Sequence, residues 1–272
     1  MDIQKNNLDD ELDALFHRMH VSLFGVGGIH RFSILPKEKR PDSLLPGARS
    51  VIAAALPVIP SAHDWSIRNQ VKGGTGIAFY QGMIDLVGSE LDRCLYEVAR
   101  FLLDEGYRVI WQPTFPKVKK ADMESPHEPW KEQAPISQVL AGYFCGLGSI
   151  GMNHLLLTQK YGPRIRINSL ITDAELTESP MSEELCTRCG RCLRACPVHA
   201  FRINKSLENL AKTNYNKEAC WKSRVLYRSN RQCDCGGRCI ISCPVGEVAI
   251  PESASDRYLR RPVQKIKEKI TQ

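Results

Sequence analysis

Residues 186–200 read CTRCGRCLRACPVHA, and residues 233–246 read CDCGGRCIISCPVG. The first stretch has the spacing Cys-x2-Cys-x2-Cys-x3-Cys-Pro, and the second ends in the same Cys-x3-Cys-Pro. This is the spacing of bacterial ferredoxins, in which three cysteines hold one [4Fe–4S] cluster and the fourth ligates a second cluster. Short Cys-x2-Cys turns bring three thiolates toward a compact cube from one loop. The spacing therefore predicts two [4Fe–4S] clusters.

Two other uses of clustered cysteines fit this spacing less well. Zinc ribbons take their thiolates from separated Cys-x2-Cys pairs, whereas here three cysteines run together and the motif is doubled. Disulfide frameworks are typical of small secreted domains. The N-terminal sequence MDIQKNNLDDELDALF has neither the basic segment nor the apolar run of an export signal. We therefore expect reduced thiols in a cytoplasmic protein.

The cysteines are distributed unevenly along the 272 residues, a length that is enough for one large domain and a small one. Of the 11 cysteines, only Cys94 and Cys145 lie outside the interval from Cys186 to Cys243. This asymmetry indicates a metal-binding module attached to a separate domain. The parts we expect are a first domain at residues 1–177, a cluster domain at 178–250 and a basic tail at 251–272.

The formal net charge is +7, with much of the excess in the final third of the chain. A basic balance can attract nucleic acid, and it can equally attract an acidic redox partner. The charge is not concentrated enough to choose between them, and the basic tail is expected to be a solvated surface. No apolar run reaches the length of a membrane span, so we expect no membrane partner.

Hydrophobic periodicity predicts a domain that mixes helices and strands. Apolar residues recur at helical spacing over 8–19 and over 76–105, and Cys94 is expected to be buried in the second of these helices. The continuous apolar run SVIAAALPV at 50–58 is typical of a buried central strand. Further expected elements are strands at 107–112 and 164–173, a strand ending in a glycine-rich turn at 21–30, a long loop at 113–135, and a helix, glycine turn and strand over 135–158.

The segment GLGSIGMNHLLLTQKYGPRIRINSLITDAEL, residues 146–176, resembles the stretch that precedes the ferredoxin module in epoxyqueuosine reductases and reductive dehalogenases. The segments PGARSVIAAALPV (46–58) and FLLDEGYRVIWQP (101–113) resemble those families too. The likeness covers almost the whole chain. It implies an α+β fold, with a nitroreductase-like domain that holds a base-off cobalamin, followed by a bacterial ferredoxin-like domain with two [4Fe–4S] clusters.

The resemblance also assigns residues to the cobalamin pocket. Glycines suit such a site because the backbone can approach a flat macrocycle closely where no Cβ atom intervenes. Low-potential clusters would reduce the cobalt, which carries the difficult chemistry. The residues assigned in this way are Gly146, Leu147, Gly148, Gly151, Asn153, Thr158, Arg164, Thr172 and Asp173.

The pattern of these families further implies the cluster ligands. One set is Cys186, Cys189, Cys192 and Cys243. The other set is Cys196, Cys220, Cys239 and either Cys233 or Cys235. The sequence departs from the family spacing at this last position, and we prefer Cys235 because CGGRCIISCP keeps the approach to the following cysteine with one extra residue.

A proton donor can be placed by the same resemblance. In epoxyqueuosine reductases a catalytic aspartate lies three residues before a proline, ahead of the glycine turn. The corresponding position here is Glu132, three residues before Pro135, which could act as a general acid if burial raised its pKa. An ordinary exposed loop glutamate is the other interpretation. Reductive dehalogenases use a tyrosine instead, for which Tyr80 and Tyr143 are candidates.

These features predict a cobalamin-dependent iron–sulfur oxidoreductase that reduces a small organic or modified-nucleoside substrate. Its electrons would come from a low-potential donor such as flavodoxin or ferredoxin. The helical-repeat extension of epoxyqueuosine reductases is absent from this sequence, which puts a tRNA partner in doubt. One alternative is an iron–sulfur electron-transfer protein that activates another corrinoid protein and lacks its own cobalamin. Another keeps the first domain but gives it flavin.

Overall fold

The computed structural model describes residues 2–68, 75–111, 136–201, 215–220, 223 and 235–248. Three predictions fall outside these residues: the proton donor Glu132, the alternative ligand Cys233, and the basic tail at 251–272. The long loop expected at 113–135 lies outside them as well. In the helices that are described, none combines the length and the apolar character needed to cross a bilayer.

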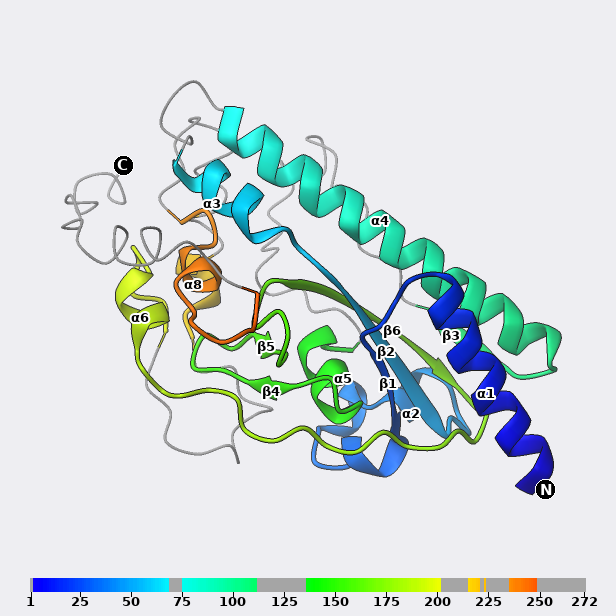
Figure 1. Cartoon of the computed structure of the whole chain (residues 1–272). Coiled ribbons are helices and arrows are strands. Elements are labelled where there is room, and N and C mark those ends of the chain that lie inside the picture. The colour runs from blue at the N-terminus through cyan, green and yellow to red at the C-terminus, as the bar shows by residue number, and fades with distance from the viewer. Residues whose placement is uncertain are drawn as a thin grey trace, which may run out of the picture.

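The first part of the chain is built on a four-stranded antiparallel sheet (Figure 1). Its strands, in spatial order, are β1 (Phe24–Gly28), β2 (Ser50–Pro57), β6 (Ile165–Thr172) and β3 (Val109–Trp111). Strands β2 and β6 pair along their whole length, from Ser50 opposite Thr172 to Pro57 opposite Ile165. The prediction of a buried central strand at 50–58 is therefore confirmed.

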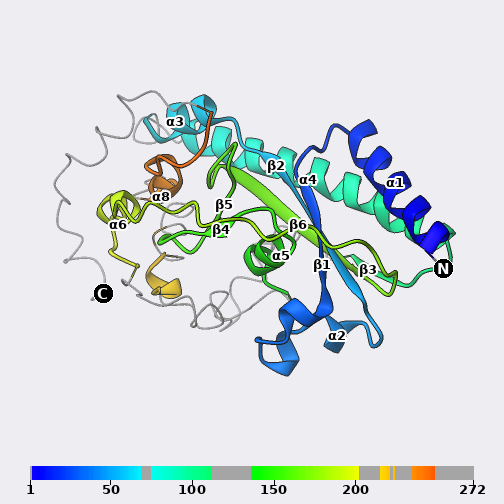
Figure 2. The same ribbon diagram turned by 60° about the horizontal axis from the view of Figure 1, so that its bottom comes forward.

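Helices cover both faces of this sheet (Figure 2). The helices α1 (Asp2–Arg18) and α4 (Thr75–Asp104) lie on one face, and α5 (Gln138–Phe144) lies on the other. Side chains of a strand alternate between the faces. Ile52 and Ala54 of β2 accordingly join the core under α1 and α4, whereas Val51, Ala53 and Ala55 join the core under α5. Because both faces are buried, β2 has no polar position after its first residue.

The two long helices were predicted from their apolar period, and both are confirmed. The buried leucines Leu91, Leu95 and Leu102 of α4 face the sheet, and Cys94 is buried beside them as expected. Helix α3 (Pro60–Arg68) was not anticipated. The remaining short elements are η1 (Ile29–Phe32), η2 (Lys37–Lys39), α2 (Pro41–Leu44), β4 (Ser149–Ile150), β5 (Leu156–Leu157), α6 (Arg191–Ala195) and α8 (Arg238–Ile241).

The glycines near residue 25 do not form the turn that was expected at 21–30. Gly25, Gly27 and Gly28 lie inside strand β1. A Cβ atom on Gly25 would lie 2.2 Å from the carbonyl oxygen of Cys145, and one on Gly27 would lie 2.6 Å from that of Phe144. The glycines therefore let the end of α5 pack directly on β1, which corrects the prediction.

The segment that leads from β6 to the first cysteine is fixed along β1. The backbone N–H of Ser179 donates to the carbonyl oxygen of Val26 at 2.8 Å, and the Val26 N–H donates to the Ser179 hydroxyl at 2.9 Å. Closer to the cysteines, the backbone N–H of Leu185 donates to the hydroxyl of Ser149 at 2.8 Å. The start of the cysteine-rich region is thus positioned by the sheet and the elements that pack on it, here called the sheet domain.

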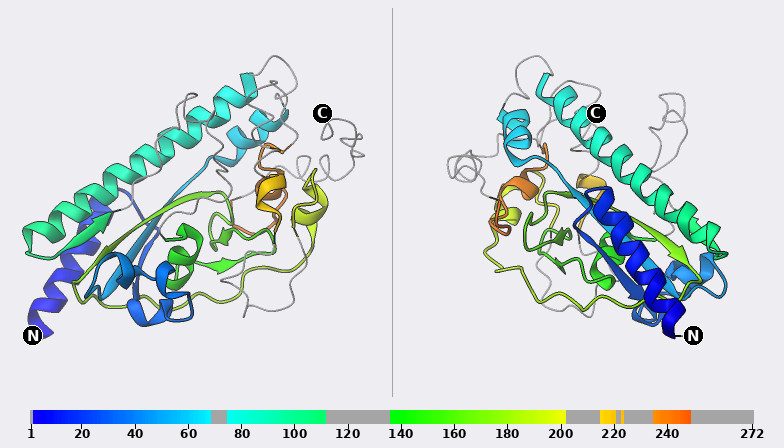
Figure 3. Two further views of the ribbon diagram at one scale, coloured as in Figure 1. Left: turned by 180° about the vertical axis from the view of Figure 1, so that it is seen from behind. Right: turned by 45° about the vertical axis from the view of Figure 1, so that its right-hand side comes forward.

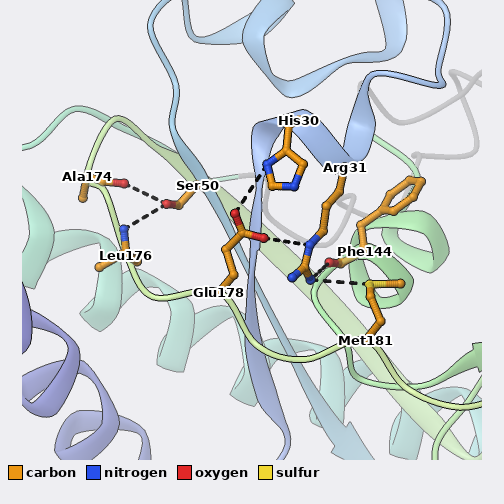
Figure 4. Close-up of polar contacts among 8 residues, drawn as sticks. All are labelled: His30, Arg31, Ser50, Phe144, Ala174, Leu176, Glu178 and Met181. Atoms are coloured by element: carbon orange, nitrogen blue, oxygen red, sulfur yellow. Dashed lines mark hydrogen bonds and ion pairs between the residues drawn. The ribbon is translucent and has the colours of Figure 1, made fainter.

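Side chains reinforce this attachment (Figure 4). The Glu178 carboxylate forms an ion pair with Arg31 at 2.8 Å and lies 3.4 Å from Nδ1 of His30. Arg31 also donates to the carbonyl oxygen of Phe144 at 2.8 Å. Glu178, η1 and the end of α5 therefore form one connected polar network, which fixes the path of the chain toward residue 186.

Candidate iron–sulfur site

The cysteine-rich residues 186–201 and 235–248, here called the cysteine module, lie at one end of the sheet. Figures 1 and 3 show α6 and α8 of this module side by side, next to α3 and to the β4–β5 hairpin. The two helices lie in similar stretches of sequence, GRCLRACP at 190–197 and GRCIISCP at 237–244. Each begins after a glycine with positive φ, Gly190 at 70° and Gly237 at 76°. Each is followed within two residues by Cys-Pro, which turns the chain away.

Four of the predicted ligands surround one pocket. It lies between the cysteine module and the β4–β5 loop of the sheet domain. Cys192 and Cys243 are buried, Cys186 is half-buried and Cys189 is exposed. The residues that line the pocket are Gly151, Met152, Asn153, Leu157, Cys186, Thr187, Cys189, Gly190, Cys192, Cys243, Pro244 and Val245.

The pKa of Cys192 shows how closely these thiols lie together. Burial, followed by the charges of Cys243, Cys186 and Cys189, raises the pKa of Cys192 to about 12. Such a group of thiols does not stay deprotonated without compensation by a metal centre. The pocket therefore has the donor chemistry of a metal-thiolate site.

A second group of thiols lies around Cys239. Burial raises the pKa of Cys239 well above the usual range, and the charges of Cys235, Cys220 and Cys196 raise it further. Cys192 of the first group adds a smaller effect of the same sign. Cys235, Cys220 and Cys196 are thus grouped around Cys239, and the effect of Cys192 places this group beside the first. Cys233, the other choice that the sequence left open, lies outside the described residues. The assignment of these cysteines as ligands stays a prediction.

Three donors of the sheet domain bind backbone carbonyls of the cysteine module. His63 of α3 lies 3.0 Å from the Gly236 oxygen, and Asn153 of the β4–β5 loop donates to the Cys239 oxygen at 3.3 Å. Arg164, just before β6, donates to the Cys243 oxygen at 3.1 Å and to the Val245 oxygen at 2.7 Å. Each donor comes from a different element, so the module is held at three separate points.

The residues present fit [4Fe–4S] clusters. The pocket is lined by four cysteines, and four thiolates are the donor set of a [4Fe–4S] cluster. The backbone N–H of Ala200 donates to the sulfur of Cys196 at 3.3 Å, and N–H groups directed at ligand sulfurs stabilise such clusters. Beside Cys243, the buried hydroxyl of Ser242 and Nε of Arg164 have no hydrogen-bond partner in the described part of the chain.

The nine residues assigned to cobalamin lie in several separate parts of the fold. A Cβ atom on Gly146 would lie 2.2 Å from the Pro180 oxygen, and one on Gly148 would lie 2.0 Å from the Leu157 oxygen. Neither glycine faces open space, since protein backbone occupies it. Leu147 is buried in the core under α5, and Gly151 lies at the cysteine pocket with Asn153.

The polar members of that set bind protein atoms. The Thr158 hydroxyl contacts the carbonyl oxygen of Gly162 at 3.3 Å. At the opposite end of β6, Thr172 accepts a hydrogen bond from the N–H of Ala174, and Asp173 binds Arg108 at 2.7 Å. Of the nine positions, Gly151 and Asn153 line the cysteine pocket. The assignment of all nine to cobalamin stays a prediction.

Three other residues named from the sequence or its resemblance, Cys145, Tyr80 and Tyr143, contact other protein groups. The thiol of Cys145 is fully buried and donates to the carbonyl oxygen of Val51 at 3.2 Å, and burial raises its pKa to about 12. Tyr80 stacks on His63, with ring centroids 4.6 Å apart. Tyr143 packs against the ring of Phe144. His63 was not singled out from the sequence, because a lone histidine in SAHDW carries no signal of a contact with residue 236.

Comparisons with known proteins agree with this geometry. A family described as a 4Fe-4S dicluster domain matches residues 185–247. The chain is 30% identical over 180 residues to the epoxyqueuosine reductase of Gloeobacter violaceus, which covers 65% of this chain and 49% of that protein. It is 45% identical over 64 residues to a tetrachloroethene reductive dehalogenase of Desulfitobacterium hafniense, which covers 22% of this chain and 12% of that protein.

A solved structure has a similar fold. It is a reductive dehalogenase for which a mechanism of B12-dependent dehalogenation was put forward. It aligns with a TM-score of 0.56 and 17% identity, over 91% of this chain and 35% of that chain. The predicted resemblance to both families and the predicted ferredoxin-type module are confirmed. The chain spans about half the length of the first epoxyqueuosine reductases that it matches.

Proposed function

Because the chain is similar to epoxyqueuosine reductases and to reductive dehalogenases, we propose that it is an iron–sulfur oxidoreductase of their superfamily. In this proposal it takes electrons from a low-potential donor such as flavodoxin or ferredoxin. It passes them through two [4Fe–4S] clusters to a cobalamin and on to a small organic or modified-nucleoside substrate. The domains would be those predicted, a cofactor domain at 1–177 and a cluster domain at 178–250.

The observation that carries the proposal is the division of eight cysteines into two adjacent groups. One group surrounds the pocket beside Asn153, and the other surrounds the buried thiol of Cys239. Cys192 and Cys239 belong to different groups, yet the charge of Cys192 raises the pKa of Cys239. Two clusters held by these groups would lie close enough for electrons to pass between them.

The chain's own residues would hold and shield the redox centres. When bound, the clusters supply low-potential electrons and a corrinoid supplies the bond-breaking chemistry. Asn153 and Arg164 fix the backbone of two proposed ligands, Cys239 and Cys243, through their carbonyl oxygens. Glu132 remains the proposed proton donor. The nine positions assigned to cobalamin from the sequence remain proposed.

The substrate class follows from the names of the relatives. One relative is named for epoxyqueuosine, a modified nucleoside, and another for tetrachloroethene, a small organic molecule. Both names describe reductions. We therefore propose a reductive reaction on one of these two classes of molecule.

A second candidate function is supported by a specific observation. Gly146 and Gly148 pack against protein backbone, and Asn153 and Arg164 are committed to the cysteine module. A protein with this arrangement could carry electrons to a separate corrinoid protein without binding cobalamin itself. Flavin in the first domain is the third possibility, and the same experiment tests all three.

The test is anaerobic purification from cells supplied with cobalamin, followed by iron, cobalt and flavin analysis. About eight irons with one cobalt per chain would support the reductase. In that case Glu132→Gln should abolish turnover while leaving the iron and cobalt content unchanged. About eight irons with neither cobalt nor flavin would overturn the cobalamin proposal and favour the electron-transfer protein. Flavin in place of cobalt would favour the third candidate.

A further inference from the structure

Arg164 is a buried cation beside the cysteine pocket. It is 1% exposed and is the largest of the fully buried side chains in the described residues. Its guanidinium donates to the carbonyl oxygens of Cys243 and Val245, and its Nε has no hydrogen-bond partner among the residues that the structure describes. No carboxylate in the described part of the chain forms an ion pair with it. A buried charge without a counter-charge is strongly unfavourable, so its retention calls for a compensating anion.

The position of Arg164 identifies that anion. The carbonyl that it binds belongs to Cys243, which lines the pocket together with Cys186, Cys189 and Cys192. A [4Fe–4S] cube with four thiolate ligands carries a net negative charge, and this charge grows by one when the cluster is reduced. A fixed cation in a protein interior stabilises the more negative state. The cation therefore favours the reduced cluster.

We propose that Arg164 sets the reduction potential of the cluster held by Cys186, Cys189, Cys192 and Cys243, by supplying the buried positive charge that stabilises its reduced form. Arg164 is a positioning residue in this role, since its hydrogen bonds go to the backbone of a ligand. The inference rests on the cluster part of the proposed function. It does not depend on cobalamin, on Glu132 or on the identity of the substrate.

The local backbone keeps the guanidinium in place. Gly246 has a φ of 120°, and a Cβ atom there would lie 2.4 Å from Nη2 of Arg164. A Cβ atom on Gly162 would lie 1.9 Å from the carbonyl oxygen of Val245. The two glycines let the loop at 243–246 close over the guanidinium, which fixes the distance between the charge and the pocket.

The test is a mediated redox titration of the purified, iron-loaded protein with dithionite, monitored by electron paramagnetic resonance. Arg164→Gln removes the charge and keeps an amide donor. At a fixed potential, the ratio of reduced to oxidised cluster should fall at least tenfold for one of the two clusters, a shift of about 59 mV for a one-electron couple. The other cluster should titrate as in the wild type. Arg164→Lys keeps the charge and should keep both ratios close to those of the wild type.

The matched control is Arg49→Gln. It removes the same charge from the opposite end of the sheet, where Arg49 is exposed and paired with Glu175. It should shift neither potential. Loaded Arg164→Gln protein with wild-type potentials would overturn the proposal, because a purely structural role changes stability without moving the potential.

If the Arg164→Gln variant retains no iron, the redox titration of the Arg164→Lys variant tests the proposal. A tenfold fall of the ratio in this variant, which keeps the charge, would show that hydrogen-bond geometry sets the potential and would overturn the proposal. Unchanged ratios would support it. Iron analysis of the wild type comes first. A wild-type protein without clusters would overturn both the proposed function and this inference. Iron without cobalt would overturn only the cobalamin part of the proposed function.

Discussion

The Nε2 atom of His63 lies 3.0 Å from the carbonyl oxygen of Gly236, and this contact joins helix α3 of the sheet domain to the cysteine module. Because a carbonyl oxygen only accepts, Nε2 must carry the proton. Burial lowers the pKa of His63 to about 4, so the ring is neutral near pH 7. A residue without any chemical motif therefore holds the loop next to Cys235.

A pH-dependent contribution of His63 to stability follows. Its pKa is lower in the folded protein than the 6.5 of the free side chain, so its contribution is present above pH 6.5 and is lost as the pH falls toward about 4. His63→Gln keeps a donor at the same position and does not titrate. We expect the melting temperature of the wild type to fall more than that of His63→Gln between about pH 7 and pH 5. Parallel profiles would show that His63 does not titrate on unfolding.

A Cβ atom at Gly148 should be costly. It would lie 2.0 Å from the carbonyl oxygen of Leu157, and neither backbone segment can move aside. Gly148→Ala is expected to destabilise the fold by at least about 2 kcal/mol, measured by chemical denaturation. The matched control is Gly82→Ala on α4, where nothing lies within 4 Å; it should stabilise by about 0.5–1 kcal/mol. Equal effects of the two substitutions would contradict the packing described for Gly148.

Asn153 should be needed for cluster retention. Its side-chain amide donates to the Cys239 oxygen, and its side-chain oxygen accepts from the N–H of Leu155. Asn153→Asp keeps the acceptor but replaces the donor by a carboxylate oxygen that repels the carbonyl. The purified variant should lose iron, whereas the same amide-to-acid change at Gln81 on α4 should leave the iron content unchanged. Full iron content in Asn153→Asp would show that this contact does not position Cys239.

The ion pair between Asp173 and Arg108 gives a second pH effect. Burial alone would raise the pKa of Asp173, but hydrogen bonds from the Nε and backbone N–H of Arg108, together with its charge, lower it. The stabilisation is therefore present above the ordinary aspartate pKa and is lost as the pH falls through the lowered value. Asp173→Asn should cost roughly 1 kcal/mol or less near pH 7, because the pair is partly exposed. Its difference from the wild type should shrink in acid; a constant difference would contradict this.

The main elements of the sheet domain could be predicted because their signals are local. The uninterrupted apolar run at 50–58 indicates a strand with both faces buried, and the apolar period over 76–105 indicates a long amphipathic helix. Gly25 and Gly27 misled the prediction, because a glycine that permits a turn and one that permits close packing look the same in a sequence. Which it is depends on the oxygens of Cys145 and Phe144, more than 110 residues away.

The candidate site was predictable to the extent that it depends on spacing. The Cys-x2-Cys-x2-Cys-x3-Cys-Pro run indicated two clusters, and the structure places Cys186, Cys189, Cys192 and Cys243 around one pocket. The assignment of the two ligand sets stays a prediction. The contacts of His63 and Asn153 with the module were not predictable, since they join residues far apart in the chain. Arg164 was assigned from the sequence only to the cobalamin pocket. Its burial depends on how the loop at 243–246 closes.

Iron analysis of anaerobically purified protein tests the central claim most directly, namely that the cysteines form two four-thiolate sets. We expect about eight irons per chain in the wild type and in Cys94→Ser, whose thiol lies in the core under α4. Cys243→Ser should reduce the content to about four, through loss of the first set alone. Zinc in place of iron, or about eight irons retained in Cys243→Ser, would contradict the account.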